Sequence, residues 1–135
     1  MTDLQHERLG WWWICVFAAL GLVLETLHGL KLPVYLDPAA GPRRLLWTLA
    51  HAHGVLLGLV HLGFAATLRA RPAWEGRGRI LASRLLVAAA VLLPAGFFLG
   101  GLVIHGGDPN ALVLLTPVGG LALVGAAALT ARATP

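Results

Sequence analysis

Glutamate and histidine side chains stand at positions from which they could bind a metal. Glu25 and His28 are three positions apart, so both side chains would lie on one face of a helix. Helical bundles use a carboxylate and an imidazole at this spacing to hold iron or manganese. His51, His53 and His105 are further candidate ligands. Imidazole suits copper, zinc and iron, while a carboxylate ligand favours iron or zinc.

The histidines of the next apolar segment are not equivalent. On a regular helix His51 and His53 point about 200° apart, so they cannot both face one centre. His51 is therefore the preferred ligand, and His53 could face a different neighbouring helix. His51, Gly54, Gly58 and His61 form one stripe along the helix. Glycines on this stripe would let a neighbouring helix, or a flat cofactor, approach the backbone closely.

Three interpretations of these residues stay open. In the simplest, Glu25 and His28 bond each other, and the other histidines form hydrogen bonds across helices or lie in interfacial water. In the second, a copper, zinc or iron ion is held by His28, by His51 or His53, and by His105, with Glu25 as an additional ligand. The spacings match no fixed ligand signature such as H-E-x-x-H.

The third interpretation is a b-type haem held by two histidines on different helices. Its cofactor-binding residues would be His51 and His61, with Gly54 and Gly58 making room for the ring. His61 also has two other possible roles. It could simply bond a backbone carbonyl or a hydroxyl of a neighbouring helix, or it could serve as a proton relay.

The elements that position these residues are apolar segments long enough to cross a membrane. Apolar residues make up 58% of the 135-residue chain and charged residues 12%, against about 25% charged residues in an average soluble domain. A bilayer core requires about 20 residues of helix. Four segments meet this requirement, at about residues 10–30, 45–68, 85–104 and 111–131. The sequence therefore predicts an all-α integral membrane protein, a single antiparallel bundle of four transmembrane helices in contact with the lipid bilayer.

Prolines and glycines mark the connections between these segments. Residues 31–44 and 69–79 are expected to form loops, and residues 106–110 a tight turn in which Asn110 or Asp108 caps the last helix. His105 is expected to end the third helix. Gly96 and Gly100 form a close-packing motif in that helix. His6 is expected in a polar N-terminal tail.

The basic residues predict the orientation. The positive-inside rule places the more basic side in the cytoplasm. One side of the predicted bundle would carry Arg8, Arg69, Arg71, Arg77, Arg79, Arg84 and Arg132, and the other Lys31, Arg43 and Arg44. Both termini are then cytoplasmic, in the inner (plasma) membrane of a bacterium. Glu25, His28, His51, His53 and His105 would gather near the outer, periplasmic face.

The same residues restrict the possible functions. Ten basic residues lie between apolar blocks and form no aromatic-lined patch, so nucleic-acid binding is not expected. Ser83 is the single serine, which argues against a serine hydrolase. The favoured function is a redox-active membrane metalloprotein with a small lipophilic or gaseous substrate. The alternative from another class is a small non-catalytic subunit, or an ion- or proton-path component, of a larger membrane complex. Small residues in the last helix would also suit a homo-oligomer.

Overall fold

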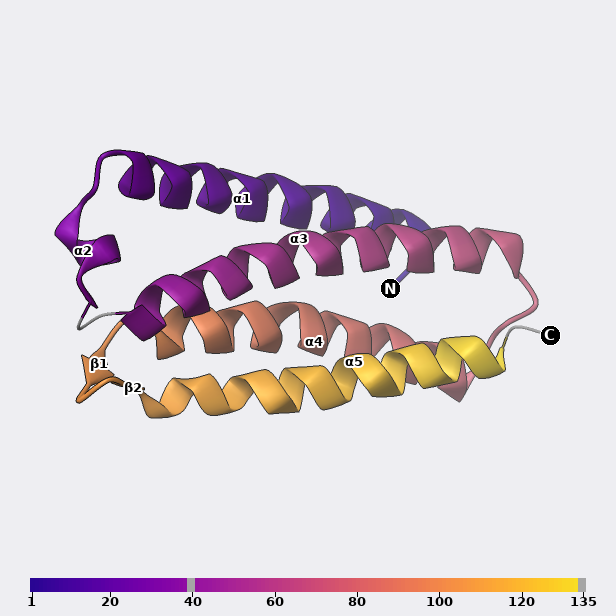
Figure 1. Cartoon of the computed structure of the whole chain (residues 1–135). Helices are drawn as coiled ribbons and strands as arrows, with labels where there is room; N and C mark the ends of the chain where they lie inside the picture. Colours follow the sequence, from indigo (N-terminus) through magenta and orange to yellow (C-terminus); the bar gives the residue numbers. More distant parts are fainter. Residues whose placement is uncertain (39–40, 134–135) are drawn as a thin grey trace.

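The computed structural model describes residues 1–38 and 41–133. Four long apolar helices pack antiparallel, and each is a candidate membrane span (Figure 1). They are α1 (Asp3–Gly29), α3 (Gly41–Ala70), α4 (Arg77–Gly100) and α5 (Leu115–Arg132). Shorter elements connect them: α2 (Pro33–Leu36), strands β1 (Ile104–His105) and β2 (Asp108–Pro109), and the 3-10 helix η2 (Ala111–Leu114).

The two ends of the bundle differ. The start of α1, the loop from α3 to α4 and the end of α5 lie at one end, which we call the terminal end (Figure 1). The opposite end carries α2 and the antiparallel β1–β2 pair, and we call it the hairpin end. Gly106 and Gly107 form the turn of this pair, and both adopt positive φ angles that favour glycine.

The first helix is longer than its apolar segment. The side chain of Thr2 accepts a hydrogen bond from the backbone of Gln5, and the Gln5 side chain accepts one from the backbone of Thr2. This capping box starts α1 at Asp3 and places His6 within the helix. The expectation that His6 lies in a polar tail is therefore wrong, because the cap extends the helix past the end of the apolar segment.

Helices α3 and α4 also differ from their predicted bounds. α3 begins at Gly41, so Arg43 and Arg44 belong to its first turns rather than to a loop. Pro42 is compatible with this start, because a first-turn residue needs no backbone donor. α4 ends at Gly100, so His105 lies in β1 and does not end the helix.

The hairpin end is held by side chains that satisfy free carbonyl groups. The Arg43 guanidinium donates to the carbonyls of Gly101 and Leu102 just beyond α4, and to that of Val34. Asn110 accepts a hydrogen bond from the backbone of Leu112 and so caps η2, which leads into α5. Asn110 therefore caps the 3-10 turn before the last helix, whereas α5 itself follows Leu114 without a side-chain cap.

The long helices lie side by side in chain order, with α3 against α1 and α4, and α4 against α5 (Figure 1). Glycines set the separation of the last pair. A Cβ atom on Gly96 would lie 2.6 Å from the backbone nitrogen of Thr116, and one on Gly100 would lie 2.9 Å from the Val113 side chain. The predicted close-packing motif is confirmed. Apolar side chains of α3, α4 and α5 form one core cluster, centred on Phe64, Leu86 and Ala126.

Candidate functional site

The predicted ligands of α1 lie on the surface of the protein. Glu25 and His28 are both exposed in the last turns of the helix. The His28 ring faces the buried Tyr35 of α2 edge-on, with 6.3 Å between the ring centroids. The Tyr35 hydroxyl in turn lies 3.2 Å from the Thr48 hydroxyl of α3. His28 therefore packs beside the α2 segment at the hairpin end.

His51 and His53 face different helices, as the helical geometry predicts. Nδ1 of His51 donates to the carbonyl of Phe17 in α1 at 2.6 Å. Nδ1 of His53 donates to the carbonyl of Leu49 in its own helix at 2.8 Å, and its ring lies 4.9 Å from that of Phe97 in α4. Because a carbonyl only accepts, both rings carry a proton on Nδ1, and Nε2 takes no part in these two hydrogen bonds. Ligating histidines commonly have this arrangement.

The structure does not gather the predicted ligands into one group. His105 is exposed in β1. Within residues 1–38 and 41–133, no three histidine, cysteine or acidic side chains are grouped as they would be around a metal ion. Metal binding by Glu25, His28, His51, His53 and His105 stays a prediction.

The two glycines of the α3 stripe pack against helix α1. A Cβ atom on Gly54 would lie 2.0 Å from the Phe17 ring of α1, and one on Gly58 would lie 2.7 Å from Ile14. The two glycines therefore admit α1 against the α3 backbone, and the Phe17 ring occupies the space that a haem would need there. Haem binding at this stripe stays a prediction.

A different set of polar side chains meets inside the bundle, closer to the terminal end. Nδ1 of His6 in α1 lies 2.8 Å from Nδ1 of His61 in α3. Nε2 of His6 lies 2.8 Å from the Oγ atom of Ser83 in α4. Both histidines are 0% exposed and Ser83 is 3% exposed. We call these three residues the His6–His61–Ser83 chain, and it joins three of the four long helices.

Neighbouring groups hold this chain in position. The His6 and His61 rings stack with 5.0 Å between centroids, and Phe64 packs edge-on against His6 at 4.7 Å. Arg69 at the end of α3 pairs with Asp3 at 3.0 Å and also with Glu7. These carboxylates flank His6 in the first turns of α1, so the ion pairs fix the start of α1 against α3.

The two ends of the His6–His61–Ser83 chain have different surroundings. Ser83 lines a pocket of about 250 Å³ at the terminal end, together with Glu75, Gly76 and Arg79. Nε2 of His61 is buried and has no hydrogen-bond partner among the described residues. Leaving a buried polar atom unpaired costs about 1–3 kcal/mol. The His6–His61–Ser83 chain therefore runs from a surface pocket to an unpaired nitrogen in the interior.

The His6–His61–Ser83 chain can adopt two hydrogen-bond patterns, which differ in the positions of the protons. In the first, His61 Nδ1 donates to His6 Nδ1, and His6 Nε2 donates to Ser83, so His61 Nε2 holds a lone pair. In the second, Ser83 donates to His6 Nε2, and His6 Nδ1 donates to His61 Nδ1, so His61 Nε2 holds a proton. The two patterns interconvert when protons move along the chain.

Sequence reasoning considered His61 as a proton relay but missed His6 and Ser83 as its partners, although one signal for His6 was present. The pattern Thr2-x-x-Gln5 is a capping box, and it would have extended the first helix to include His6. The sequence suggested that His61 bonds a carbonyl or a hydroxyl of a neighbouring helix. Its partner is instead the His6 ring, and the nearby Thr67 hydroxyl bonds the carbonyl of Gly63.

Fold and site together define an all-helical protein with four candidate membrane spans and a buried histidine–histidine–serine chain. Comparisons with protein-family models, with curated proteins and with solved structures give no match.

Proposed function

We propose that this chain is a multi-pass protein of a bacterial inner membrane, with the terminal end in the cytoplasm, and that the His6–His61–Ser83 chain is a proton relay. The four apolar helices support the membrane location. The excess of arginines at the terminal end supports the orientation. The protein would then be a proton-path component of a membrane complex.

The unpaired Nε2 atom of His61 is the observation that carries this proposal. A purely structural histidine pair would be expected to satisfy all of its buried polar atoms, because each unpaired one destabilises the fold. An unpaired nitrogen at the inner end of a hydrogen-bonded chain can instead receive or release a proton. Ionisable groups within membrane spans often mark such proton paths.

Inward transfer begins with the second hydrogen-bond pattern. Ser83 receives a proton from the pocket and passes its own proton to His6 Nε2. His6 then passes the Nδ1 proton to His61 Nδ1, and His61 passes the Nε2 proton to a water molecule that would have to reach this nitrogen from the other half of the bundle. One proton enters and one leaves, so the charge of the chain is unchanged, and the first pattern results. Net inward flux then requires the Ser83 hydroxyl and the two imidazole groups to regain the second pattern by reorientation, because reverse transfer would return the proton to the pocket.

Proton flux into vesicles tests the function. A relay through the terminal half of the bundle shortens the hydrocarbon barrier that a proton must cross, so reconstituted protein should raise proton influx above that of protein-free vesicles at a fixed membrane potential. His61→Phe and His6→Phe keep a ring of similar size but remove the nitrogens, and both should lower the influx to background.

His53→Phe is the matched control for this experiment. His53 lies on the same helix as His61, but within the described part of the chain its ring hydrogen-bonds a carbonyl of its own helix, so its variant should conduct like the wild type. Circular dichroism confirms that each variant retains its helices. Equal influx for wild type and His61→Phe, with both folded, would contradict the proposal.

A metal centre at the outer face is the second candidate function, and the geometry of His51 favours it. The hydrogen bond from Nδ1 to the Phe17 carbonyl leaves Nε2 as the atom that would bind copper, iron or zinc. Purified protein should then contain stoichiometric metal that is lost in His51→Ala and His105→Ala. A Soret band would indicate haem instead. Protein that is colourless and metal-free, even after metal is added, would exclude both.

A further inference from the structure

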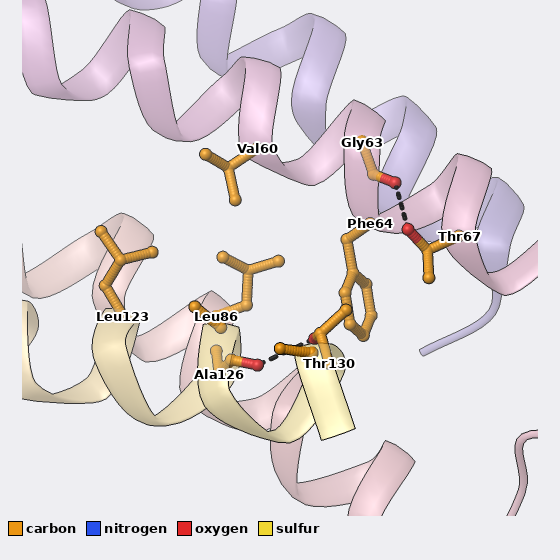
Figure 2. A pocket seen from close by; sticks show the side chains of 10 residues that line it. Val60, Gly63, Phe64, Thr67, Leu86, Leu123, Ala126 and Thr130 are labelled. Carbon is orange, nitrogen blue, oxygen red and sulfur yellow. Dashed lines mark hydrogen bonds between the residues drawn. The ribbon is translucent and has the colours of Figure 1, made fainter. Parts of the chain in front are cut away.

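An apolar groove lies between α3 and α5, on the surface of the bundle (Figure 2). Its volume is about 450 Å³. Side chains of α3 line one wall, Leu86 of α4 forms the floor, and the last turns of α5 line the other wall (Figure 2). We call it the α3–α5 groove; its lining includes Val60, Gly63, Phe64, Thr67, Leu123 and Thr130.

The polar atoms of the groove are already satisfied. The Thr67 hydroxyl donates to the carbonyl of Gly63 at 2.9 Å, and the Thr130 hydroxyl donates to that of Ala126 at 2.8 Å (Figure 2). Hydroxyl groups bonded to their own helix do not require a polar partner from outside. The groove therefore suits an apolar ligand. It lies between two helices, α3 and α5, that are both candidate membrane spans.

The end of the groove is basic. Arg71 follows α3 just beyond Thr67, and its Nη1 atom donates to the carbonyl of Ala133 at 2.7 Å, which holds it beside the end of α5. Arg132 is exposed in the last turn of α5. A guanidinium group has five N–H donors, so Arg71 keeps further donors after this bond. Guanidinium groups bind phosphate well.

We propose that the α3–α5 groove binds one acyl chain of an anionic phospholipid, whose phosphate is held by Arg71 and Arg132. Apolar lining at membrane depth and positive charge at one end match the two parts of such a lipid. Anionic lipids are attracted to basic residues at the membrane surface. This inference is independent of the proton relay, since no residue of the His6–His61–Ser83 chain lines the groove.

Native mass spectrometry in mild detergent tests the proposal, with phosphatidylglycerol and phosphatidylcholine added separately. Wild-type protein should retain one phosphatidylglycerol per chain and should bind it at least several-fold better than phosphatidylcholine. Gly63→Leu should abolish this binding, because Gly63 lines the groove, a Cβ atom there meets nothing within 4 Å, and the new side chain would occupy the space of the acyl chain.

Gly120→Leu is the matched control, because Gly120 is also a helical glycine with open space around it but does not line the groove. It should bind phosphatidylglycerol like the wild type. Arg71→Gln with Arg132→Gln should lower phosphatidylglycerol binding to the level of phosphatidylcholine.

Two outcomes would overturn the proposal. Equal phosphatidylglycerol binding by wild type and Gly63→Leu would show that the lipid does not occupy the groove. A wild-type dimer that Gly63→Leu converts to a monomer, with no lipid retained by either, would assign the groove to a second copy of the chain.

Discussion

At the scale of single residues, two glycines of α1 have opposite surroundings and give a matched test of packing. A Cβ atom on Gly21 would lie 2.3 Å from Cε1 of His51, whereas one on Gly29 would meet nothing within 4 Å. Gly21→Leu should displace the His51 ring and destabilise the protein by about 1–3 kcal/mol, as overpacking generally does.

Thermal unfolding in detergent measures this difference. Gly29→Leu should unfold within a few degrees of the wild type, and Gly21→Leu at a clearly lower temperature. If the two variants unfold at the same temperature, the His51 ring does not pack against Gly21.

Residue types and spacing predicted correctly that two histidines of α3 face different helices. The 200° separation of His51 and His53 followed from helix geometry alone, and the structure confirms that they face α1 and α4. The pairing of His6 with His61 could not be predicted in this way. These residues are far apart in sequence, and their contact depends on how α1 and α3 pack.

At the scale of elements, the start of α1 determines whether His6 can reach His61. Thr2→Ala removes the side chain that caps the helix, and loss of such a cap costs about 1 kcal/mol. The first turn should then fray, and His6 should become accessible to solvent. Amide hydrogen exchange at residues 3–9 should accelerate, and diethyl pyrocarbonate should modify His6 faster.

Thr2→Ser provides the control, because serine caps a helix as well as threonine does. It should restore slow exchange and protect His6. Unchanged exchange in Thr2→Ala would mean that the ion pairs of Arg69 with Asp3 and Glu7 suffice to hold the first turn.

Hydropathy predicted the number and type of long elements but not their bounds. Apolar content sets which residues lie in lipid, whereas capping and arginine contacts set where a helix begins and ends. For this reason α3 includes Arg43 and Arg44, and α4 ends before His105. The predicted loop at residues 31–44 also contains α2, while residues 39 and 40 lie outside the described part of the chain.

At the scale of the whole molecule, the proposed orientation predicts which loops are accessible from each side. In a Cys15→Ser background, a cysteine at Asp108 would report the hairpin end and a cysteine at Glu75 the terminal end. Both positions are exposed. A membrane-impermeant maleimide should label the first in intact cells with a permeabilised outer membrane, and the second only after lysis. The reverse pattern would show that the positive-inside rule fails for this chain.

The arrangement of the whole bundle explains why the predicted metal ligands and the buried polar residues are different sets. Topology alone places Glu25, His28, His51, His53 and His105 toward the hairpin end, but it does not say which side chains point inward. In the structure Glu25, His28 and His105 are exposed, whereas His6, His61 and Ser83 are buried. Burial depends on the packing of α1, α3 and α4 together, and hydropathy along one segment does not contain that information.

The proton relay is the central claim, and nitrogen NMR of ¹⁵N-histidine-labelled protein in lipid bilayers tests it most directly. Exchange between the two hydrogen-bond patterns should give the Nδ1 atoms of His6 and His61 averaged shifts, between those of protonated and unprotonated nitrogen, with a cross-peak joining them. Nδ1 of His53 should show the shift of a fully protonated nitrogen. If one Nδ1 atom of the His6–His61 pair is always protonated and the other never is, the hydrogen bond between them is static. The His6–His61–Ser83 chain would then carry no protons.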